Sequence, residues 1–134
     1  MHEPPRVRVA ALVVSDDGIL LVRHEKAGRA YWLLPGGGVE PGEELAVALR
    51  RELREECGFG TGVHLRGPVA LAESIAPHGG RHIIHVVFGV DLDDGLVEHV
   101  VAQDDAVRNH RLVHRGELGQ LDLRPPIRRF LERY

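Results

Sequence analysis

Cysteine is almost missing from this sequence, because Cys57 is the only one among 134 residues. A single cysteine excludes an intrachain disulfide, and it favours a reducing, cytoplasmic environment. No segment approaches the roughly 18 consecutive apolar residues that a membrane helix requires. Residues 1–8 also lack the apolar core of a signal peptide. These absences predict a soluble, intracellular protein that does not act at a membrane.

Neither sign of charge is in large excess, because 17 Lys and Arg residues stand against 20 Asp and Glu residues. Proteins that neutralise many nucleic-acid phosphates normally present a wide basic face. The net charge of −3 therefore gives no support to a nucleic-acid partner, although a local basic patch is compatible with it. The apolar fraction of 43% is ordinary for a globular protein. We expect residues 1–134 to form a single domain.

Several short apolar segments have the length and composition of β-strands. Asp16-Asp17-Gly18 separates two of them and is typical of a hairpin turn. Pro35-Gly36-Gly37-Gly38 contains four residues that interrupt regular structure, and it predicts a loop. Residues 83–90 are apolar enough for a central strand that is covered on both faces. The strands are predicted at residues 7–13, 19–22, 33–34, 69–75, 83–92 and 111–114.

One helix is predicted directly after the glycine-rich segment. Gly42 is its expected N-cap, and Glu43 and Glu44 would favour the positive end of the helix dipole. Gly58 and Gly60 are expected to end it. Four residues at helical spacing should face the core, namely Ala46, Leu49, Leu53 and Cys57.

A second helix is predicted from Pro125-Pro126 to Tyr134, since proline suits a first helical turn. Strands with helices on both sides belong to the α/β class. The expected architecture is a single-domain α/β/α sandwich with a mixed sheet. The order of the strands does not follow from these patterns.

Three carboxylates on the first helix are the main functional feature. Glu52, Glu55 and Glu56 are spaced i, i+3 and i+4, so they share one face. Like charges at this spacing repel, and a divalent cation would offset the repulsion. Oxygen ligands of this kind suit Mg²⁺ or Mn²⁺ rather than Zn²⁺. A solvated charged face is the common alternative, and the glutamates taken alone favour that alternative.

The glycine-rich segment before the helix changes this balance. Glycines allow the backbone to approach a ligand closely, and backbone N–H groups can hold phosphate oxygens. A tight turn without a ligand would use the same residues. A loop suited to phosphate beside a helix suited to a metal nevertheless points to phosphoryl chemistry.

The spacing of these residues resembles a known family motif. The segment from Gly37 to Phe59 is similar to the complete Nudix box, G-x5-E-x7-R-E-U-x-E-E-x-G-U, where U is apolar, and every fixed position is filled. The resemblance implies the Nudix fold, an α/β/α sandwich. It also implies a hydrolase that cuts a phosphate–phosphate bond in a nucleoside diphosphate linked to another moiety. Magnesium is the expected cofactor, with Mn²⁺ as a substitute.

The resemblance also implies roles for individual residues. Glu52, Glu55 and Glu56 would be the catalytic, metal-binding glutamates, and Glu52 could in addition be the base or orient it. Arg51 and Glu43 resemble the pair that ties the helix to its loop, a structural role. Gly37 and Gly38 would shape the substrate-binding loop beside the metal.

Other residues were open to more than one interpretation. An acidic residue outside the motif often joins the site in this family, and the candidates are Glu98, Asp104 and Asp105, each of which could equally be solvated. Arg23, His24, Lys26 and Arg29 form a basic cluster that could meet substrate phosphates. Solvated loop charges are the commoner explanation for such a cluster.

The leading function is therefore a metal-dependent pyrophosphohydrolase with a small nucleotide substrate. The alternatives are a non-catalytic nucleotide-sensing module with the same fold, and a structural protein with an acidic helix, which would not explain the glycines. ADP-ribose or another nucleotide sugar and a (deoxy)nucleoside triphosphate are the favoured substrates, and no residue decides between them. A homodimer is compatible with the sequence.

Overall fold

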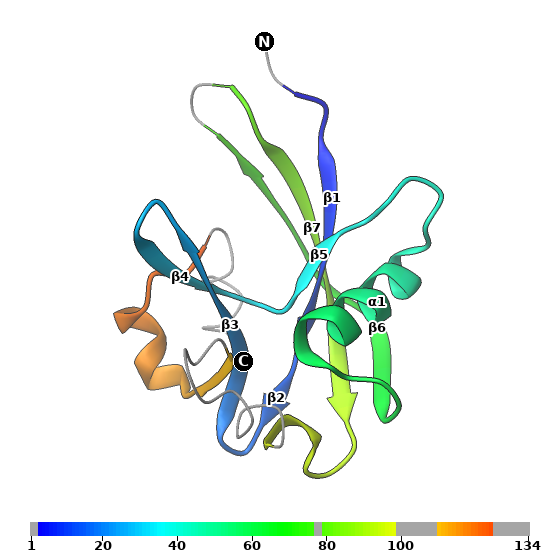
Figure 1. Ribbon diagram of the computed structural model, residues 1–134, viewed down its shortest axis with the longest axis vertical. Helices are drawn as coiled ribbons and strands as arrows, with labels where there is room; N and C mark the ends of the chain where they lie inside the picture. Colours follow the sequence, from blue (N-terminus) through cyan, green and yellow to red (C-terminus); the bar gives the residue numbers. More distant parts are fainter. Residues whose placement is uncertain (1–2, 77–78, 99–109, 125–134) are drawn as a thin grey trace.

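The computed structural model describes residues 3–76, 79–98 and 110–124 (Figure 1). The predicted helix after Pro125 and the acidic candidates Asp104 and Asp105 lie outside these residues. The described elements are β1 Arg6–Leu12, β2 Val14–Ser15, β3 Gly18–Lys26, β4 Arg29–Leu33, β5 Gly36–Gly38, α1 Leu45–Cys57, β6 Val63–Ile75, β7 His82–Leu92, β8 His110–Val113 and the 3-10 helix η1 Arg115–Gln120.

The strands form two four-stranded sheets that diverge from the end of β1. The first sheet has the order β5-β1-β7-β6, in which β1 and β7 are parallel and the other pairs are antiparallel. It is therefore a mixed sheet, as predicted. The second sheet has the order β2-β3-β4, with β8 paired to the other edge of β3. The predicted hairpin is present, since Ser15 pairs with Gly18 across the Asp16-Asp17 turn.

The central position of β7 agrees with its apolar sequence. The strand lies between β1 and β6, and residues 85–90 are buried. His85 is the only buried polar residue among those that the structure describes. The neighbouring strand β6 forms the edge and has an irregular register around Pro68. Proline is tolerated there because an edge strand at a bulge can do without one backbone donor.

The predicted loop at residues 35–38 is wrong in part, because Gly36–Gly38 forms the strand β5. It pairs with β1 from Arg8↔Gly38 to Ala10↔Gly36. Glycine is needed here for close approach rather than for a turn. A Cβ atom on Gly36 would collide with the carbonyl oxygen of Val9, and one on Gly37 would lie 2.5 Å from both carboxylate oxygens of Glu52. The glycines at residues 36–38 therefore belong to a strand whose close neighbours leave no room for a side chain at residues 36 and 37.

The predicted start of the first helix is also wrong, by two residues. Helix α1 begins at Leu45 with Glu44 as its N-cap, and no acidic residue lies in its first turn. Gly42 instead has a left-handed φ of 81° within a turn that the Glu43 N–H closes onto the Glu40 carbonyl. The predicted end is confirmed, because Gly58 is the left-handed C-cap and donates to the Arg54 carbonyl at 3.0 Å.

Helix α1 covers the first sheet and contacts β5 and β1 (Figure 1). Its buried residues are Ala48, Leu49, Leu53 and Cys57, whereas the predicted core residue Ala46 is half-buried. Burial of the Cys57 thiol raises its pKa to about 12, so it is a packing residue rather than a nucleophile. Among the described residues, no helix is long and apolar enough to cross a membrane.

Candidate active site

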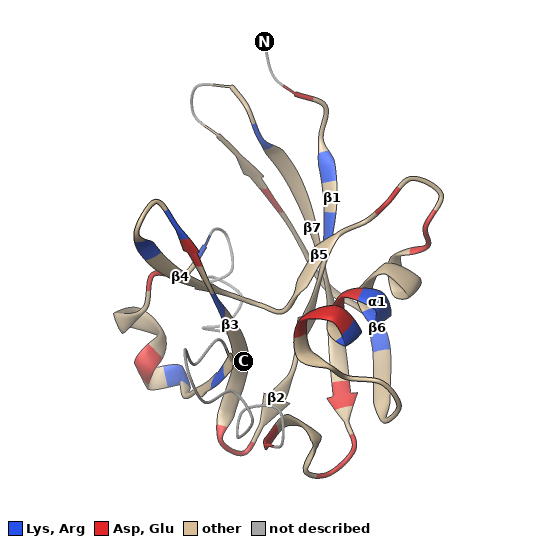
Figure 2. Cartoon of the chain, in the orientation of Figure 1, with Lys and Arg blue, Asp and Glu red and all other residues tan. Residues whose placement is uncertain are grey.

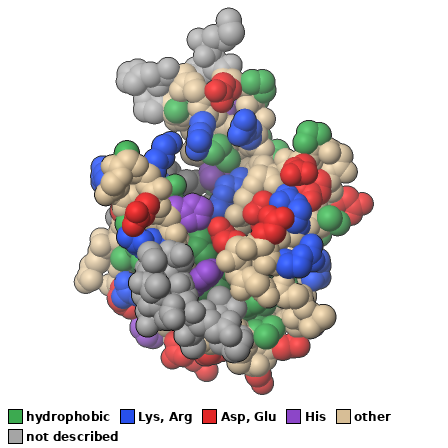
Figure 3. Space-filling model, viewed as in Figure 1, with side chains coloured by type: hydrophobic (Ala, Val, Ile, Leu, Met, Phe, Trp, Pro, Cys, Tyr) green, Lys and Arg blue, Asp and Glu red, His purple; other side chains and the backbone are tan. Residues whose placement is uncertain are grey.

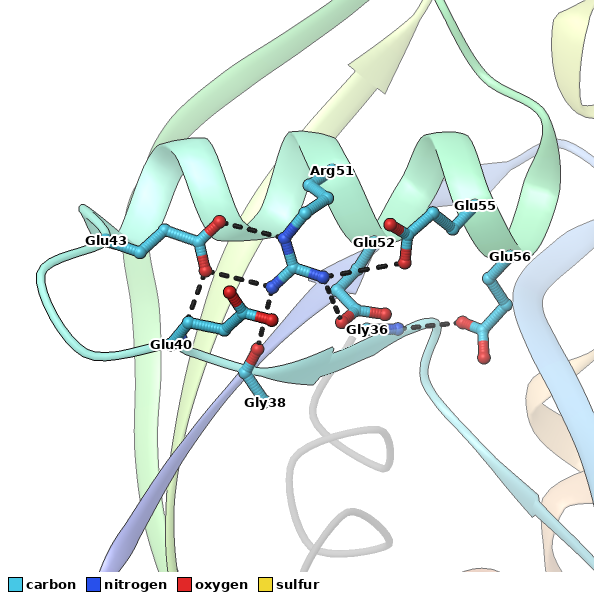
Figure 4. A network of polar contacts seen from close by, with 8 residues as sticks. All are labelled: Gly36, Gly38, Glu40, Glu43, Arg51, Glu52, Glu55 and Glu56. Atoms are coloured by element: carbon cyan, nitrogen blue, oxygen red, sulfur yellow. Dashed lines mark hydrogen bonds and ion pairs between the residues drawn. The ribbon is translucent and has the colours of Figure 1, made fainter.

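The three glutamates of the motif lie on one side of α1 and point toward β5 (Figure 4). Their helical spacing of three and four residues produces this arrangement, as the sequence predicts. The side chains of Glu52 and Glu56 are about one-fifth exposed, whereas that of Glu55 is 60% exposed. The acidic side of α1 faces the strand β3 of the second sheet (Figure 2). The glutamates are thus presented between the two sheets.

Arg51 joins this helix to the segment that precedes it. Its guanidinium makes a two-point contact with Glu43, with Nε 2.8 Å from Oε2 and Nη2 2.9 Å from Oε1. Nη2 also donates to the Gly38 carbonyl at 3.0 Å, and Nη1 donates to Glu52 at 2.8 Å and to Glu55 at 3.5 Å. One side chain therefore contacts the strand β5, the turn before α1 and two of the glutamates (Figure 4).

The Glu43 carboxylate is held in its ionised form by this arrangement. Hydrogen bonds from Arg51, followed by one from the Glu40 N–H, lower the pKa of Glu43 to about 2. The same contacts raise the pKa of Arg51 above its ordinary value. Glu43 thus bonds Arg51 and the Glu40 N–H, and Arg51 bonds Glu43, the Gly38 carbonyl and two glutamates, which leaves both side chains little freedom to act on a substrate.

Glu56 has a separate set of partners on the side away from Arg51. Its Oε1 accepts a hydrogen bond from the Gly36 N–H at 3.0 Å, and its Oε2 lies 3.2 Å from His24 Nε2. The backbone carbonyl of Glu56 lies 3.0 Å from His110 Nε2. The sequence placed His24 in a basic cluster ahead of the site, and the structure brings it directly to a motif glutamate.

The carboxylate oxygens of Glu52, Glu55 and Glu56 are the type of ligand that a hard divalent cation such as Mg²⁺ prefers. In the described part of the chain, however, no three His, Cys, Asp or Glu side chains are grouped as a ready metal site. Glu52 and Glu55 are turned toward Arg51, and Glu56 is turned toward Gly36. All three sit on long, partly exposed side chains, so rotation about their side-chain bonds could redirect them to a common ion.

A pocket of about 570 Å³ opens beside this site, and the sequence did not predict its main polar residues. It is bounded at one end by Gly36 and Gly37 of β5, and Arg8 and His85 contribute from β1 and β7. Arg8 pairs with His85 in the parallel register, a neighbour relationship that cannot be read from the sequence without the strand order. Figure 3 shows histidine and basic side chains around a hollow beside the acidic side of α1.

Burial changes the ionisation of both residues. His85 is 6% exposed, and desolvation followed by the charge of Arg8 lowers its pKa to about 4. Its Nε2 lies 3.1 Å from Ser74 Oγ, and its Nδ1 has no partner within the described structure. Burial lowers the pKa of Arg8, which Glu56 and Glu52 partly counteract, and Arg8 Nη2 donates to the Leu34 carbonyl at 3.1 Å.

Two of the remaining expectations concern Glu98 and the basic cluster. Glu98 is exposed at the end of a short helical turn, and its proposed role as a ligand stays a prediction. Arg23 of β3 and Arg29 of β4 form ion pairs with Glu25 and Asp122. Arg23 also lines a smaller pocket with His24 and Glu56. Lys26, by contrast, lines the larger pocket.

Comparisons with solved structures identify the class of fold. The MutT protein from Methanosarcina mazei Go1 matches with a TM-score of 0.72 at 24% identity, covering 99% of this chain and 94% of that one. The Escherichia coli ORF135 protein matches with a TM-score of 0.65 at 27% identity, covering 96% and 86%. A mixed sheet, a glycine strand and an acidic helix in this arrangement define a Nudix fold, as the sequence predicts.

The family is shown by a direct match of the sequence. The family model described as "NUDIX domain" matches residues 4–134, and the chain therefore belongs to the Nudix family. An RNA pyrophosphohydrolase from Caulobacter vibrioides is 43% identical over 68 residues, which are 49% of this chain and 39% of that protein. The nucleoside triphosphatase NudI from Escherichia coli is 45% identical over 56 residues, 40% of each chain. These matches span about two-fifths of the length of the curated relatives.

Proposed function

We propose that this protein is a Mg²⁺-dependent pyrophosphohydrolase that cuts a phosphoanhydride bond in a small nucleotide. The observation that carries the proposal is the clamp in which Arg51 holds Glu43 and the Gly38 carbonyl while contacting Glu52 and Glu55. The clamp fixes the glycine strand against the helix, so a substrate phosphate on β5 would meet the carboxylates. Membership of the Nudix family supports the same activity.

The proposed metal ligands are Glu52, Glu55 and Glu56. Mg²⁺ held there would neutralise the charge of the diphosphate and supply a bound water of lowered pKa. The backbone of β5 would contribute to substrate binding, because Gly37 and Gly38 carry no side chain and leave room for phosphate oxygens. Mn²⁺ is the expected substitute, since it accepts the same oxygen ligands.

Glu52 is the proposed base, or the residue that orients it. Its carboxylate lies against the Cα of Gly37, close to where a phosphate on β5 would sit. It would take a proton from the attacking water, which then attacks phosphorus in line with the departing phosphate. No covalent enzyme intermediate is required. Arg51 and Glu43 hold this geometry and act through the glutamates, which makes them positioning residues.

The pocket beside β5 would hold the rest of the substrate. Its volume falls in the range of ordinary small-molecule sites, and Tyr31, Leu33 and Ile83 provide an apolar lining for a nucleoside. Nucleoside triphosphates and nucleotide sugars such as ADP-ribose are the proposed substrates. The name of one curated relative, the nucleoside triphosphatase NudI, favours a nucleoside triphosphate. A cytoplasmic location and a homodimer belong to the same proposal.

A direct assay tests the activity. The purified protein would be incubated with Mg²⁺ and a panel of nucleoside triphosphates, nucleotide sugars and dinucleoside polyphosphates, with EDTA controls, and products separated by chromatography. We expect metal-dependent cleavage of a phosphate–phosphate bond, with nucleoside monophosphate among the products. Binding of nucleotides without any cleavage would instead support the alternative, a nucleotide-sensing module that has kept the fold.

A further inference from the structure

Basic side chains converge on the pocket beside β5 from three separate parts of the fold. Lys26 comes from the end of β3, Arg81 from the segment leading into β7, and Arg124 from the chain after η1. Arg8 adds a fourth positive charge from β1. The described residues that line the pocket include no Asp or Glu. A cavity with this excess of positive charge in its lining attracts an anion.

The described structure leaves three of these cations without a carboxylate partner. Lys26, Arg81 and Arg124 make no ion pair within it, whereas Arg23, Arg29 and other arginines each do. Arg124 is positioned by an aromatic ring instead, with its guanidinium carbon 4.1 Å from the centre of the Tyr31 ring. Arg8 differs from these three, because it is buried and interacts with the charges of Glu52 and Glu56.

Arg81 lies too far along the sheet to serve only the cleaved bond. Gly37 of β5 is level with Val86 of β7, through their common neighbour Val9. Arg81 precedes Val86 by five residues, roughly 16 Å at the spacing of a β-strand. The diphosphate that meets Glu52, Glu55 and Glu56 would lie near Gly37. Arg81 is therefore placed to meet a different group, at the far end of the pocket.

The chemistry of the lining indicates what that group is. Tyr31, Leu33 and Ile83 are apolar parts of the lining that suit a nucleoside. Arginine binds phosphate in a planar, two-point arrangement, and lysine adds a further positive charge. We propose that this protein prefers nucleotides carrying an additional phosphate on or beyond the ribose, which Arg81 binds together with Lys26 and Arg124. This proposal rests on the proposed function, in which the helix carboxylates meet the cleaved diphosphate.

The test compares ligands that have no phosphate–phosphate bond, so that binding is measured with Mg²⁺ present and without turnover. Titration calorimetry would give the dissociation constants of 5′-AMP and adenosine 3′,5′-bisphosphate. We expect the bisphosphate to bind about tenfold more tightly, a typical effect of a charged contact. We also expect this preference to weaken with added salt. The hydrolysis assay is a separate measurement, so either result can fail without the other.

Two variants assign the preference to the pocket. Arg81→Ala should reduce the ratio of the two dissociation constants to near one, while binding of 5′-AMP changes little. Arg115→Ala is the matched control, because Arg115 is an exposed arginine of η1 outside the pocket lining, and its ratio should equal that of the wild type. Lys26→Ala supplies a second pocket variant, with a thermal melt of each protein to confirm folding.

The source of the additional phosphate is resolved with two more ligands. A 5′-phosphorylated adenosine dinucleotide that binds as tightly as the bisphosphate would identify a phosphodiester, as at the 5′ end of an oligonucleotide. A preference for adenosine 3′,5′- or 2′,5′-bisphosphate alone would identify a free ribose phosphate. Equal or undetectable binding of all these ligands and 5′-AMP would overturn the proposal. A preference that survives Arg81→Ala and Lys26→Ala would overturn it as well.

Discussion

Arg51 and Glu43 form a two-point ion pair, with Nε 2.8 Å from Oε2 and Nη2 2.9 Å from Oε1. The pair is the junction between the helix that carries the glutamates and the turn that precedes it. A planar guanidinium is required, because the same side chain also reaches the Gly38 carbonyl and Glu52. The geometry of the proposed site therefore depends on residues that need not touch the substrate.

The pair should make stability depend on pH in the acid range. The pKa of Glu43 is lowered to about 2, so its stabilising contribution is present above its ordinary pKa near 4.5 and is lost as the pH falls through 2. The free energy of unfolding of the wild type should therefore fall more steeply below pH 4.5 than that of Glu43→Gln. Urea denaturation at several pH values measures this difference. Parallel curves would show that the pair does not stabilise the fold.

Replacement of Glu56 by glutamine should remove most turnover and leave the fold intact. A neutral amide is a poor Mg²⁺ ligand, but its carbonyl oxygen can still accept the Gly36 N–H. Loss of a residue that only hydrogen-bonds to a metal ligand costs roughly 10–100-fold in activity, so loss of a ligand itself should cost about 100-fold or more. The measurement is the rate at saturating Mg²⁺.

Two variants control for other effects of that change. Glu44→Gln alters an exposed residue whose side chain makes no capping bond, and it should keep the wild-type rate. Glu43→Gln should be milder than Glu56→Gln, because it acts on the geometry of the loop. Near-normal turnover in Glu56→Gln would remove Glu56 from the proposed ligands, and equal losses in the two variants would contradict the division of roles.

Gly37→Ala should impair activity by moving Glu52 rather than by unfolding the protein. A Cβ atom at residue 37 would lie 2.5 Å from both carboxylate oxygens of Glu52, so this flexible side chain must shift. Displacement of a reacting group by about 1 Å can cost roughly 100-fold in rate. Gly119→Ala is the control, since its Cβ would meet nothing within 4 Å. Steady-state kinetics would compare the rates of the two variants, and a thermal melt would show whether both are folded. Wild-type activity in Gly37→Ala would exclude Glu52 as the base.

The fold was predictable wherever one local pattern determined the structure. The Asp16-Asp17-Gly18 hairpin, the buried strand at residues 83–90 and the end of α1 at Gly58 are confirmed. The segment at residues 36–38 was not, because glycine has little intrinsic preference for a strand. Its pairing depends on the close approach of Val9 and Glu52, which are distant in the sequence.

The proposed site divides in the same way. The common face of Glu52, Glu55 and Glu56 follows from helical spacing within one segment. The contact between Glu56 of α1 and His24 of β3 and the pairing of Arg8 of β1 with His85 of β7 join elements that are distant in the sequence, so they depend on the tertiary arrangement. The sequence did not predict that β1 and β7 pair in parallel, and this pairing is what brings Arg8 and His85 together in the pocket.

His85 provides the last prediction, a loss of stability at mildly acidic pH. Burial lowers its pKa from 6.5 to about 4, so the neutral form is the one that the fold favours. The contribution of neutral His85 to the free energy of unfolding is fully present above pH 6.5 and is lost as the pH falls toward 4. At 1.36 kcal/mol per pKa unit, the loss amounts to at most about 3 kcal/mol. His85→Leu has no titrating group there, and its free energy of unfolding should change less between pH 7 and pH 4. Equal slopes in the wild type and His85→Leu would show that His85 is not held neutral by its surroundings.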